Sequence, residues 1–194
     1  MNNYILFAIC LVIAFALTVI FYRSQNGNIE IHKNYLSVKS CAILAAILFV
    51  FVQIFTAIKS GSILGAIIGV LYHLLILFMI PKMKATDWGR NAAYGWIALD
   101  VACGIMTVCG VNINIAMPVR LGGHVLCGLW LVSSSLLMKN DPLLRWLGVF
   151  IGFYLMMYSF FGGVLPILVL APAGVLVILW LLIYGCKYPN GTTD

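Results

Sequence analysis

The chain has few charged residues and no long polar segment. Of its 194 residues only 8% are charged, with 11 Lys and Arg and 5 Asp and Glu, whereas 64% are hydrophobic. A soluble domain with so little charge could not keep its surface in water, so this composition excludes one and predicts a chain surrounded by bilayer hydrocarbon. Because the loops leave no room for an extramembrane domain, we expect residues 1–194 to form a single transmembrane helical domain.

The chain also lacks the motifs of well-characterised enzymes and cofactor proteins. It contains no H-E-x-x-H, no G-x-S-x-G and no G-x-G-x-x-G. The last apolar segment has no lysine, which excludes a retinal Schiff base. The six cysteines are dispersed without C-x-x-C spacing, and the eight methionines form no pair at ligand spacing. We therefore expect no cofactor, no metal and no identifiable catalytic residue, and an enzyme is not favoured.

Apolar windows of about 18 to 22 residues predict an all-α polytopic membrane protein, a compact bundle of seven transmembrane helices. The spans lie near residues 3–22, 38–58, 62–81, 91–112, 118–137, 144–161 and 165–185. The first span ends without a small-residue cleavage site and is interpreted as uncleaved. The last two share one apolar stretch, residues 146–186, in which Gly162 and Pro166 indicate a turn. Six spans, with that stretch as one tilted helix or a re-entrant segment, are the alternative.

The basic residues are divided unevenly between the two sides of a seven-span bundle. Two of the eleven, Lys59 and Arg120, fall on one side. The other nine fall on the opposite side: Arg23, Lys33, Lys39, Lys82, Lys84, Arg90, Lys139, Arg145 and Lys187. Basic loops stay in the cytoplasm, so we expect the N-terminus outside and the C-terminus in the cytoplasm. The net charge of +6 is thus an orientation signal, and no nucleic-acid partner is expected.

A short segment at the start of the sixth predicted span resembles bacterial multi-pass membrane families of unknown function. It reads Leu-Arg-Trp-Leu-Gly over residues 144–148. The resemblance covers too few residues to imply an activity. We expect a multi-pass protein of a bacterial cytoplasmic membrane.

Five polar side chains fall within or at the edge of the predicted spans. A rise of about 1.5 Å per residue places Asp100 and His73 near the membrane midplane, and His124 and Gln53 about six residues below the outer surface. Arg120 stands one turn above His124 on the same helix face, at the outer mouth. Because an ionisable group in hydrocarbon costs a few kcal/mol, we expect the five to converge on an outward-facing polar pocket that binds a ligand or relays protons.

Glycines repeat at four-residue spacing in two spans, a pattern typical of close helix packing. These residues are Gly61, Gly65 and Gly69 in the third span and Gly148 and Gly152 in the sixth. His73 continues the first series, so we expect it to face the same neighbouring helix. In the fourth span Trp96, Asp100 and Gly104 share a face, which predicts an aromatic wall on one side of the carboxylate and open space on the other.

Three functions are compatible with these patterns. The first is binding or translocation of a small solute or ion, coupled to protons through Asp100 and His73. The second is a membrane-embedded sensor, immunity factor or accessory subunit that docks a partner helix or a second copy through its glycines. The third is a lipid-active enzyme with Asp100 and His124 as acid and base. Purely structural roles also stay open for two of these residues. His73 could bond a backbone carbonyl, and Arg120 could reach the lipid headgroups.

Overall fold

A computed structural model describes residues 37–58, 61–162 and 164–191, so the predicted span at 3–22 lies outside the described residues. The described part is entirely helical, without a strand. Its elements are α2 (Val38–Ile58), α3 (Ile63–Met79), η1 (Ile80–Lys82), α4 (Asp87–Val108), α5 (Ile113–Leu136), α6 (Pro142–Phe161), η2 (Ile167–Leu170) and α7 (Ala171–Lys187), where η marks a 3₁₀-helix. Every predicted span within the described part therefore corresponds to a helix.

Five of these helices, α2 to α6, are long and apolar enough to cross a membrane, and α7 is a shorter apolar helix of 17 residues. Large apolar side chains of α6 remain exposed at intervals of three or four residues: Leu143, Trp146, Phe150, Phe153, Met157 and Phe160. Such a stripe on one helix face would be costly in water and is solvated by acyl chains in a bilayer. The chain thus has the helices and the apolar outer surface of an integral membrane protein.

Polar caps decide where four of the helices begin. The side chains of Ser62, Thr86, Asn112 and Asp141 accept from backbone N–H groups in the first turns of α3, α4, α5 and α6. For this reason α4 and α5 start four and five residues earlier than the predicted 91 and 118, which were set by hydropathy alone. Pro118, predicted as the first helical residue, lies within the second turn of α5.

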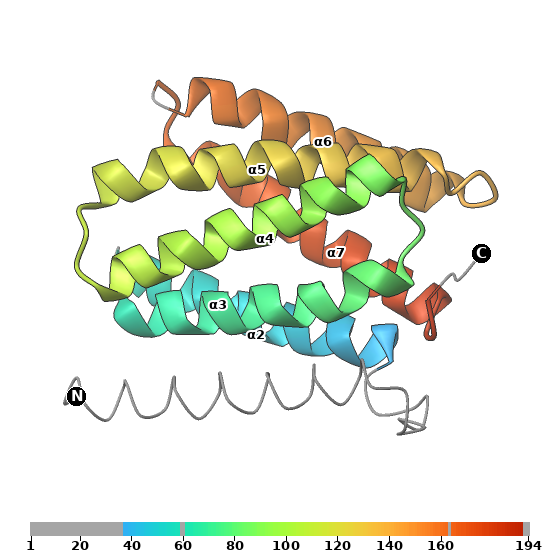
Figure 1. The fold of residues 1–194 in the computed structure, drawn as a ribbon, viewed down its shortest axis with the longest axis horizontal. Coiled ribbons are helices and arrows are strands. Elements are labelled where there is room, and N and C mark those ends of the chain that lie inside the picture. The colour runs from blue at the N-terminus through green and yellow to red at the C-terminus, as the bar shows by residue number, and fades with distance from the viewer. Residues whose placement is uncertain (1–36, 59–60, 163, 192–194) are drawn as a thin grey trace. The chain divides into compact units, whose positions relative to one another are not determined.

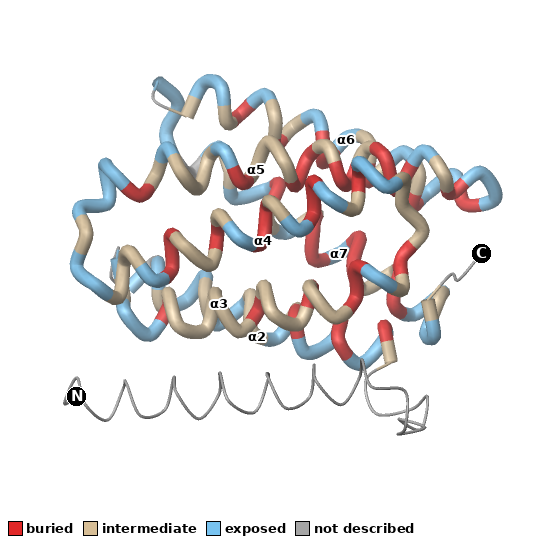
Figure 2. The backbone as a smooth tube through the Cα atoms, in the orientation of Figure 1, coloured by how far each residue is buried: buried red, intermediate tan, exposed pale blue. Residues whose placement is uncertain are grey.

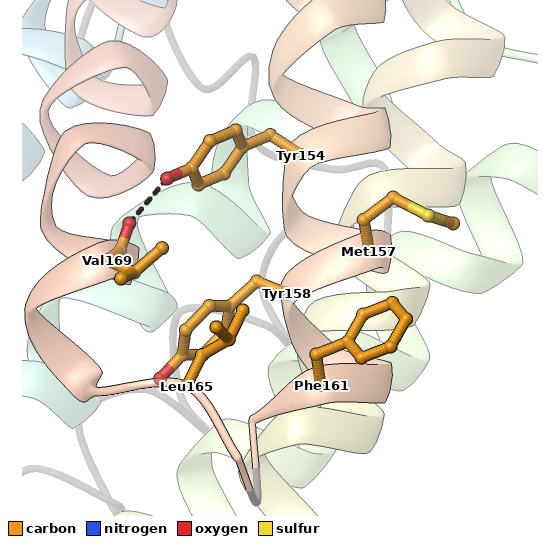
Figure 3. Close-up of a pocket in the computed structure, with 6 residues that line it drawn as sticks. All are labelled: Tyr154, Met157, Tyr158, Phe161, Leu165 and Val169. Atoms are coloured by element: carbon orange, nitrogen blue, oxygen red, sulfur yellow. Dashed lines mark hydrogen bonds between the residues drawn. The ribbon is translucent and has the colours of Figure 1, made fainter.

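The apolar stretch of residues 146–186 does not form one helix. The chain leaves α6 after Phe161, and the backbone N–H groups of Val164 and Leu165 both turn back to the Phe161 carbonyl. Pro166 follows, and a short 3₁₀-helix, η2, leads into α7. The hydroxyl of Tyr154 on α6 donates to the Val169 carbonyl at 2.6 Å, which fixes η2 against α6 (Figure 3). The single tilted helix is therefore wrong, whereas the re-entrant segment of the six-span alternative stays a prediction, since α7 has only 17 residues.

Each helix packs against the next in sequence, and α7 also packs against α2, so the six helices close into a ring. Figure 1 shows α4 between α3 and α5, with α6 beyond α5. At one end of the ring the Lys39 N–H donates to the Pro189 carbonyl, and Lys187 pairs with Asp141 at 2.6 Å. That hydrogen bond raises the pKa of the Lys187 amine. The start of α2, the α5–α6 turn and the end of α7 thus meet, and we call this the C-terminal end of the bundle.

The predicted packing glycines lie mostly against helices of the same chain. An added Cβ on Gly65 would lie 3.4 Å from Phe55 of α2, and one on Gly69 would lie 3.9 Å from Val52. Gly61 instead lies before α3 with φ +71° and serves the turn, a conformation that favours glycine.

The second glycine pair marks the crossing of α5 and α6. An added Cβ on Gly152 would lie 2.6 Å from the Gly128 carbonyl oxygen, and one on Gly148 would overlap Ser135. Backbone approaches backbone here, which only small residues allow.

Candidate functional site

A buried carboxylate lies in the middle of the ring. Asp100 of α4 is only 5% exposed. The other acidic residues that the structure describes lie outside helix interiors, since Asp87 opens α4 and Asp141 precedes α6. A carboxylate removed from water at membrane depth requires hydrogen bonds or opposite charges to offset its desolvation. Its neighbours therefore define the candidate site.

Three side chains from three helices surround Asp100. The indole N–H of Trp96, one turn away on α4, donates to Oδ2 at 2.5 Å. Nε2 of His73, from α3, lies 3.1 Å from the same oxygen. Nε of Arg120, from α5, lies 3.8 Å from Oδ1, within range of an ion pair but too far for a hydrogen bond.

The second nitrogen of His73 determines where a proton must be. Nδ1 lies 2.7 Å from the Gly69 carbonyl oxygen, and a carbonyl only accepts, so Nδ1 carries a hydrogen. A neutral imidazole protonated at Nδ1 has a lone pair at Nε2, which would face the carboxylate of Asp100 and be repelled by it. The 3.1 Å contact therefore requires one proton between Nε2 and Oδ2. His73 and Asp100 together form a proton-holding pair.

The other carboxylate oxygen of Asp100, Oδ1, accepts no hydrogen bond from the described residues. Oδ1 of Asp100 and Nδ1 of His124 are both buried, and neither has a hydrogen-bond partner among the residues that the structure describes. His124 is close enough to interact electrostatically with Asp100. Gly123 keeps this side open, because an added Cβ there would lie 3.4 Å from Oδ1. Unpartnered buried polar atoms cost about 1 to 3 kcal/mol each, so a polar ligand atom or water here would be stabilised.

Two stacked pairs of aromatic side chains, joined by an edge-to-face contact, close the ring on the C-terminal side of Asp100. These residues, which we call the aromatic plug, are Trp96, Trp130, Trp180 and Tyr184. Their consecutive ring centroids are 5.5, 6.0 and 5.6 Å apart, and all four rings are buried. Figure 2 shows buried positions gathered mainly in this half of the bundle. Arg120, which is 37% exposed, contacts Oδ1, whereas Trp96 donates to Oδ2, so the exposed side chain of the site lies against the carboxylate oxygen that the plug does not contact.

Four of the five polar residues expected at the site are brought together: His73, Asp100, Arg120 and His124. Gln53 is not, because its side chain is exposed on α2 and no contact among the described residues joins it to the others. Its predicted depth was compatible with the pocket, but depth along a helix does not determine which way a side chain faces.

Two further expectations about neighbours are wrong. The glycines of α3 face α2, whereas His73 turns to α4, where it meets Trp96 with 5.3 Å between ring centroids. The space expected beside Gly104 is filled, since an added Cβ would lie 2.6 Å from Val70 of α3. Packing at Gly104 brings α3 close to α4, which places His73 within reach of Asp100.

Sequence reasoning missed the aromatic plug, whereas the alternative that His73 bonds a backbone carbonyl is confirmed by its contact with Gly69. Trp96, Trp130 and Trp180 come one from each of three helices, so no periodicity within a helix marks them as a group. The sequence also indicated the Gly69 contact, because Gly69 and His73 are four residues apart and the histidine can reach that carbonyl.

A separate apolar pocket of about 150 Å³ lies between α6 and the turn into α7 (Figure 3). It is lined by Tyr154, Met157, Tyr158, Phe161, Leu165 and Val169, none of which belongs to the polar site. Met157 and Phe161 are more than half exposed, so the pocket is open to the surrounding acyl chains.

Within the described residues, no group of three or more His, Cys, Asp or Glu side chains is arranged to hold a metal ion. The buried Cys103 thiol near the site instead donates to the Ala116 carbonyl at 3.3 Å. Comparison of the chain with protein-family models, curated proteins and solved structures gave no match. The site therefore has to be interpreted from its own chemistry.

Proposed function

We propose that this chain binds a small polar solute or ion from outside the cell and moves it across the membrane together with a proton. The proton-holding pair of His73 and Asp100 carries the proton, and the unsatisfied side of Asp100, next to Arg120 and His124, receives the solute. The single observation that carries the proposal is the required proton between His73 Nε2 and Asp100 Oδ2, 3.1 Å apart. A shared proton beside a solute site is the arrangement that coupling requires.

The aromatic plug supports this function because it closes the site on one side. With Trp130 and Trp180 fully buried inward of Asp100, a bound solute can reach the C-terminal end only if the plug rearranges. A transporter needs its site closed to one side while it is open to the other. By the distribution of basic residues the open side is the outside, and a seven-span chain has its C-terminus in the cytoplasm.

The docking function has less support. Gly65 and Gly69 contact α2, and Gly148 and Gly152 contact α5, so these glycines pack within the chain rather than offering a free face. In the described part of the chain the nucleophilic side chains near Asp100 are the buried Cys103 and Cys127 thiols, and Cys103 donates to the Ala116 carbonyl, so the enzymatic function lacks an accessible nucleophile. Proton-coupled binding uses the contacts of Asp100 with His73 and Arg120.

The proposal is tested in liposomes that contain the purified chain and a trapped pH indicator. Gradients of sodium nitrate, ammonium gluconate and urea are imposed in turn, as an anion, a cation and a neutral solute. We expect at least one gradient to drive more proton movement in the wild type than in protein-free liposomes, which report the passive permeation of ammonia, and none to do so in Asp100→Asn. Asp87→Asn, at the start of the same helix, is the matched control and should behave as the wild type.

Folding of each variant is checked by circular dichroism and by its elution as a single species. If no gradient drives Asp100-dependent proton movement, or if Asp100→Asn is as active as the wild type, the proposed function is wrong.

A further inference from the structure

We infer that the solute is a small monovalent anion, bound and carried together with one proton. This inference rests on the proposed function and deepens it by naming the substrate class. It follows from the total charge of the site, which the contacts of His73, Asp100 and Arg120 determine.

The proton-holding pair is neutral wherever its proton lies. Imidazolium with carboxylate and imidazole with carboxylic acid both give a total charge of zero for His73 and Asp100. Arg120, whose Nε is 3.8 Å from Oδ1, adds one positive charge, because a guanidinium stays protonated. The protonated site thus carries one uncompensated positive charge inside the membrane.

No other described side chain at the site compensates this charge. The remaining titratable groups that act on Asp100 are His124 and Cys127 from α5, Tyr72 from α3 and Cys103 of α4, and Cys103 also interacts with Arg120. Thiols and phenols are uncharged at neutral pH, and a histidine adds either no charge or a positive one. An unpaired positive charge at this depth is costly, so an anion is the ligand that stabilises it.

The position of the anion follows from the unsatisfied atoms. Arg120 is 37% exposed on the open side of Asp100, and Nδ1 of the neighbouring His124 lacks a partner among the described residues. Arg120, together with His124 in the tautomer that carries the hydrogen on Nδ1, offers N–H donors to an anion next to the pair. A carboxylate oxygen such as Oδ1 only accepts hydrogen bonds and therefore cannot bond to an anion. The anion binds to the guanidinium of Arg120 instead of contacting Asp100.

Charge also sets the coupling between the anion and the proton. When the pair loses its proton it becomes negative, Arg120 is neutralised by Asp100, and the site no longer attracts an anion. The anion therefore binds best to the protonated site, and by linkage the bound anion strengthens proton binding. The loaded site is neutral, which favours passage of one proton and one anion together through the low-dielectric interior.

A cation would show the opposite coupling. It would bind the deprotonated pair and displace the proton, so binding would release protons instead of taking them up. A neutral solute would leave the proton balance unchanged. The sign of proton exchange on binding therefore identifies the substrate class without any transport step.

The experiment measures this sign with the purified full chain in nanodiscs, in weakly buffered solution with a pH indicator. Sodium nitrate is the anionic probe, ammonium gluconate the cationic probe and sodium gluconate the background. We expect nitrate to cause proton uptake approaching one per bound anion, and ammonium to cause no release. In liposomes, nitrate-driven proton movement should be unchanged when the membrane potential is clamped to different values.

Two substitutions test the residues. Arg120→Gln should weaken nitrate binding about tenfold or more, as expected when a charge partner of a buried site is lost, and Arg120→Lys should restore part of it. Arg145→Gln removes a cation at the start of α6, near the C-terminal end, and should leave nitrate binding unchanged. His73→Gln, whose amide does not titrate, leaves only the Asp100 carboxylate to take up the proton and should reduce proton uptake at neutral pH even where nitrate still binds.

The outcomes separate the two proposals. If ammonium releases protons, or if urea or ammonium drives Asp100-dependent proton movement in liposomes while nitrate does not, the anion inference is wrong and the proposed function stands. If nitrate causes proton uptake in nanodiscs but no solute moves protons across liposomes, the anion inference holds for binding and translocation is wrong. If none of the three probes has an Asp100-dependent effect, both are wrong.

Discussion

Trp96 and Trp130 stack on one another, with 5.5 Å between ring centroids and 23° between ring planes, although they belong to different helices. The two indoles differ in one respect. The Trp96 N–H donates to Asp100, whereas the buried Trp130 N–H has no partner among the described residues. The stack therefore provides a matched pair for measuring what the hydrogen bond to the carboxylate contributes.

We predict that Trp96→Phe destabilises the folded chain by about 1.5 to 3 kcal/mol more than Trp130→Phe, the range for a hydrogen bond to a charged group. Both substitutions keep a ring in the stack, and both remove similar apolar area. The measurement is the free energy of unfolding in mixed micelles of increasing dodecyl sulfate content, followed by circular dichroism. Equal losses in the two variants would show that the Trp96 N–H contributes nothing beyond ring packing.

The crossing of α5 and α6 predicts opposite effects for two glycines. Gly152→Ala places a Cβ 2.6 Å from the Gly128 carbonyl oxygen, and backbone cannot move aside as a flexible side chain can. We expect this variant to lose at least about 1 to 3 kcal/mol of stability, as overpacking does. Gly122→Ala, with only Leu99 at 3.8 Å, should gain up to about 1 kcal/mol from helix propensity. The same unfolding assay measures both, and a stabilised Gly152→Ala would contradict the close approach.

The ion pair at the C-terminal end can be tested by a double-mutant cycle. Asp141 is buried and pairs with Lys187, whose side chain is largely exposed. Lys187→Met should destabilise the chain because it leaves a buried carboxylate without its cation. Asp141→Asn in that background should recover part of the loss, since the amide oxygen keeps the cap of α6 and removes the charge.

Lys139→Met, an exposed lysine in the same turn, is the control and should have no effect. If Lys187→Met has the same free energy of unfolding as Lys139→Met, the ion pair between Lys187 and Asp141 does not stabilise the chain.

The orientation in the membrane is tested by two native cysteines. Cys109 directly follows α4 and Cys186 lies in the last turn of α7, and both are exposed. Cys186 is at the C-terminal end of the bundle, and Cys109 is at the opposite end. A membrane-impermeant maleimide added to intact cells should label Cys109 and spare Cys186, which should react only after lysis. Mass spectrometry of the labelled peptides identifies the site, and Cys109→Ser should abolish labelling from outside. The reverse pattern would invert the proposed orientation.

Much of the helical layout could be predicted from hydropathy, because an apolar segment near 20 residues has few alternatives to a helix at membrane depth. The break after Phe161 was also predictable, since Gly162 and Pro166 mark it in the sequence. Helix starts were less accurate, because caps such as Thr86 and Asn112 are polar residues that a hydropathy window excludes. Spans and their depths thus follow from composition and length.

The site could be predicted only to the level of depth. Asp100, His73, Arg120 and His124 were placed together because each lies where a polar group is costly, and the same argument wrongly included Gln53. Which face a residue presents depends on how neighbouring helices rotate against one another, and this is set by contacts such as Val70 with Gly104. Those contacts join residues far apart in sequence and leave no periodic signal.

The closed order of the helices has a consequence for how the chain is made. Each described helix after α2 touches its predecessor, so these segments can associate pairwise as they emerge from the ribosome and enter the bilayer, but the contact between α7 and α2 forms only after the last segment arrives. Until then Trp180 and Tyr184 have not joined the indoles of α4 and α5. In an incompletely synthesised chain Asp100 would lack the rings of Trp180 and Tyr184 on its C-terminal side, so the aromatic plug is complete only when the last helix has been inserted.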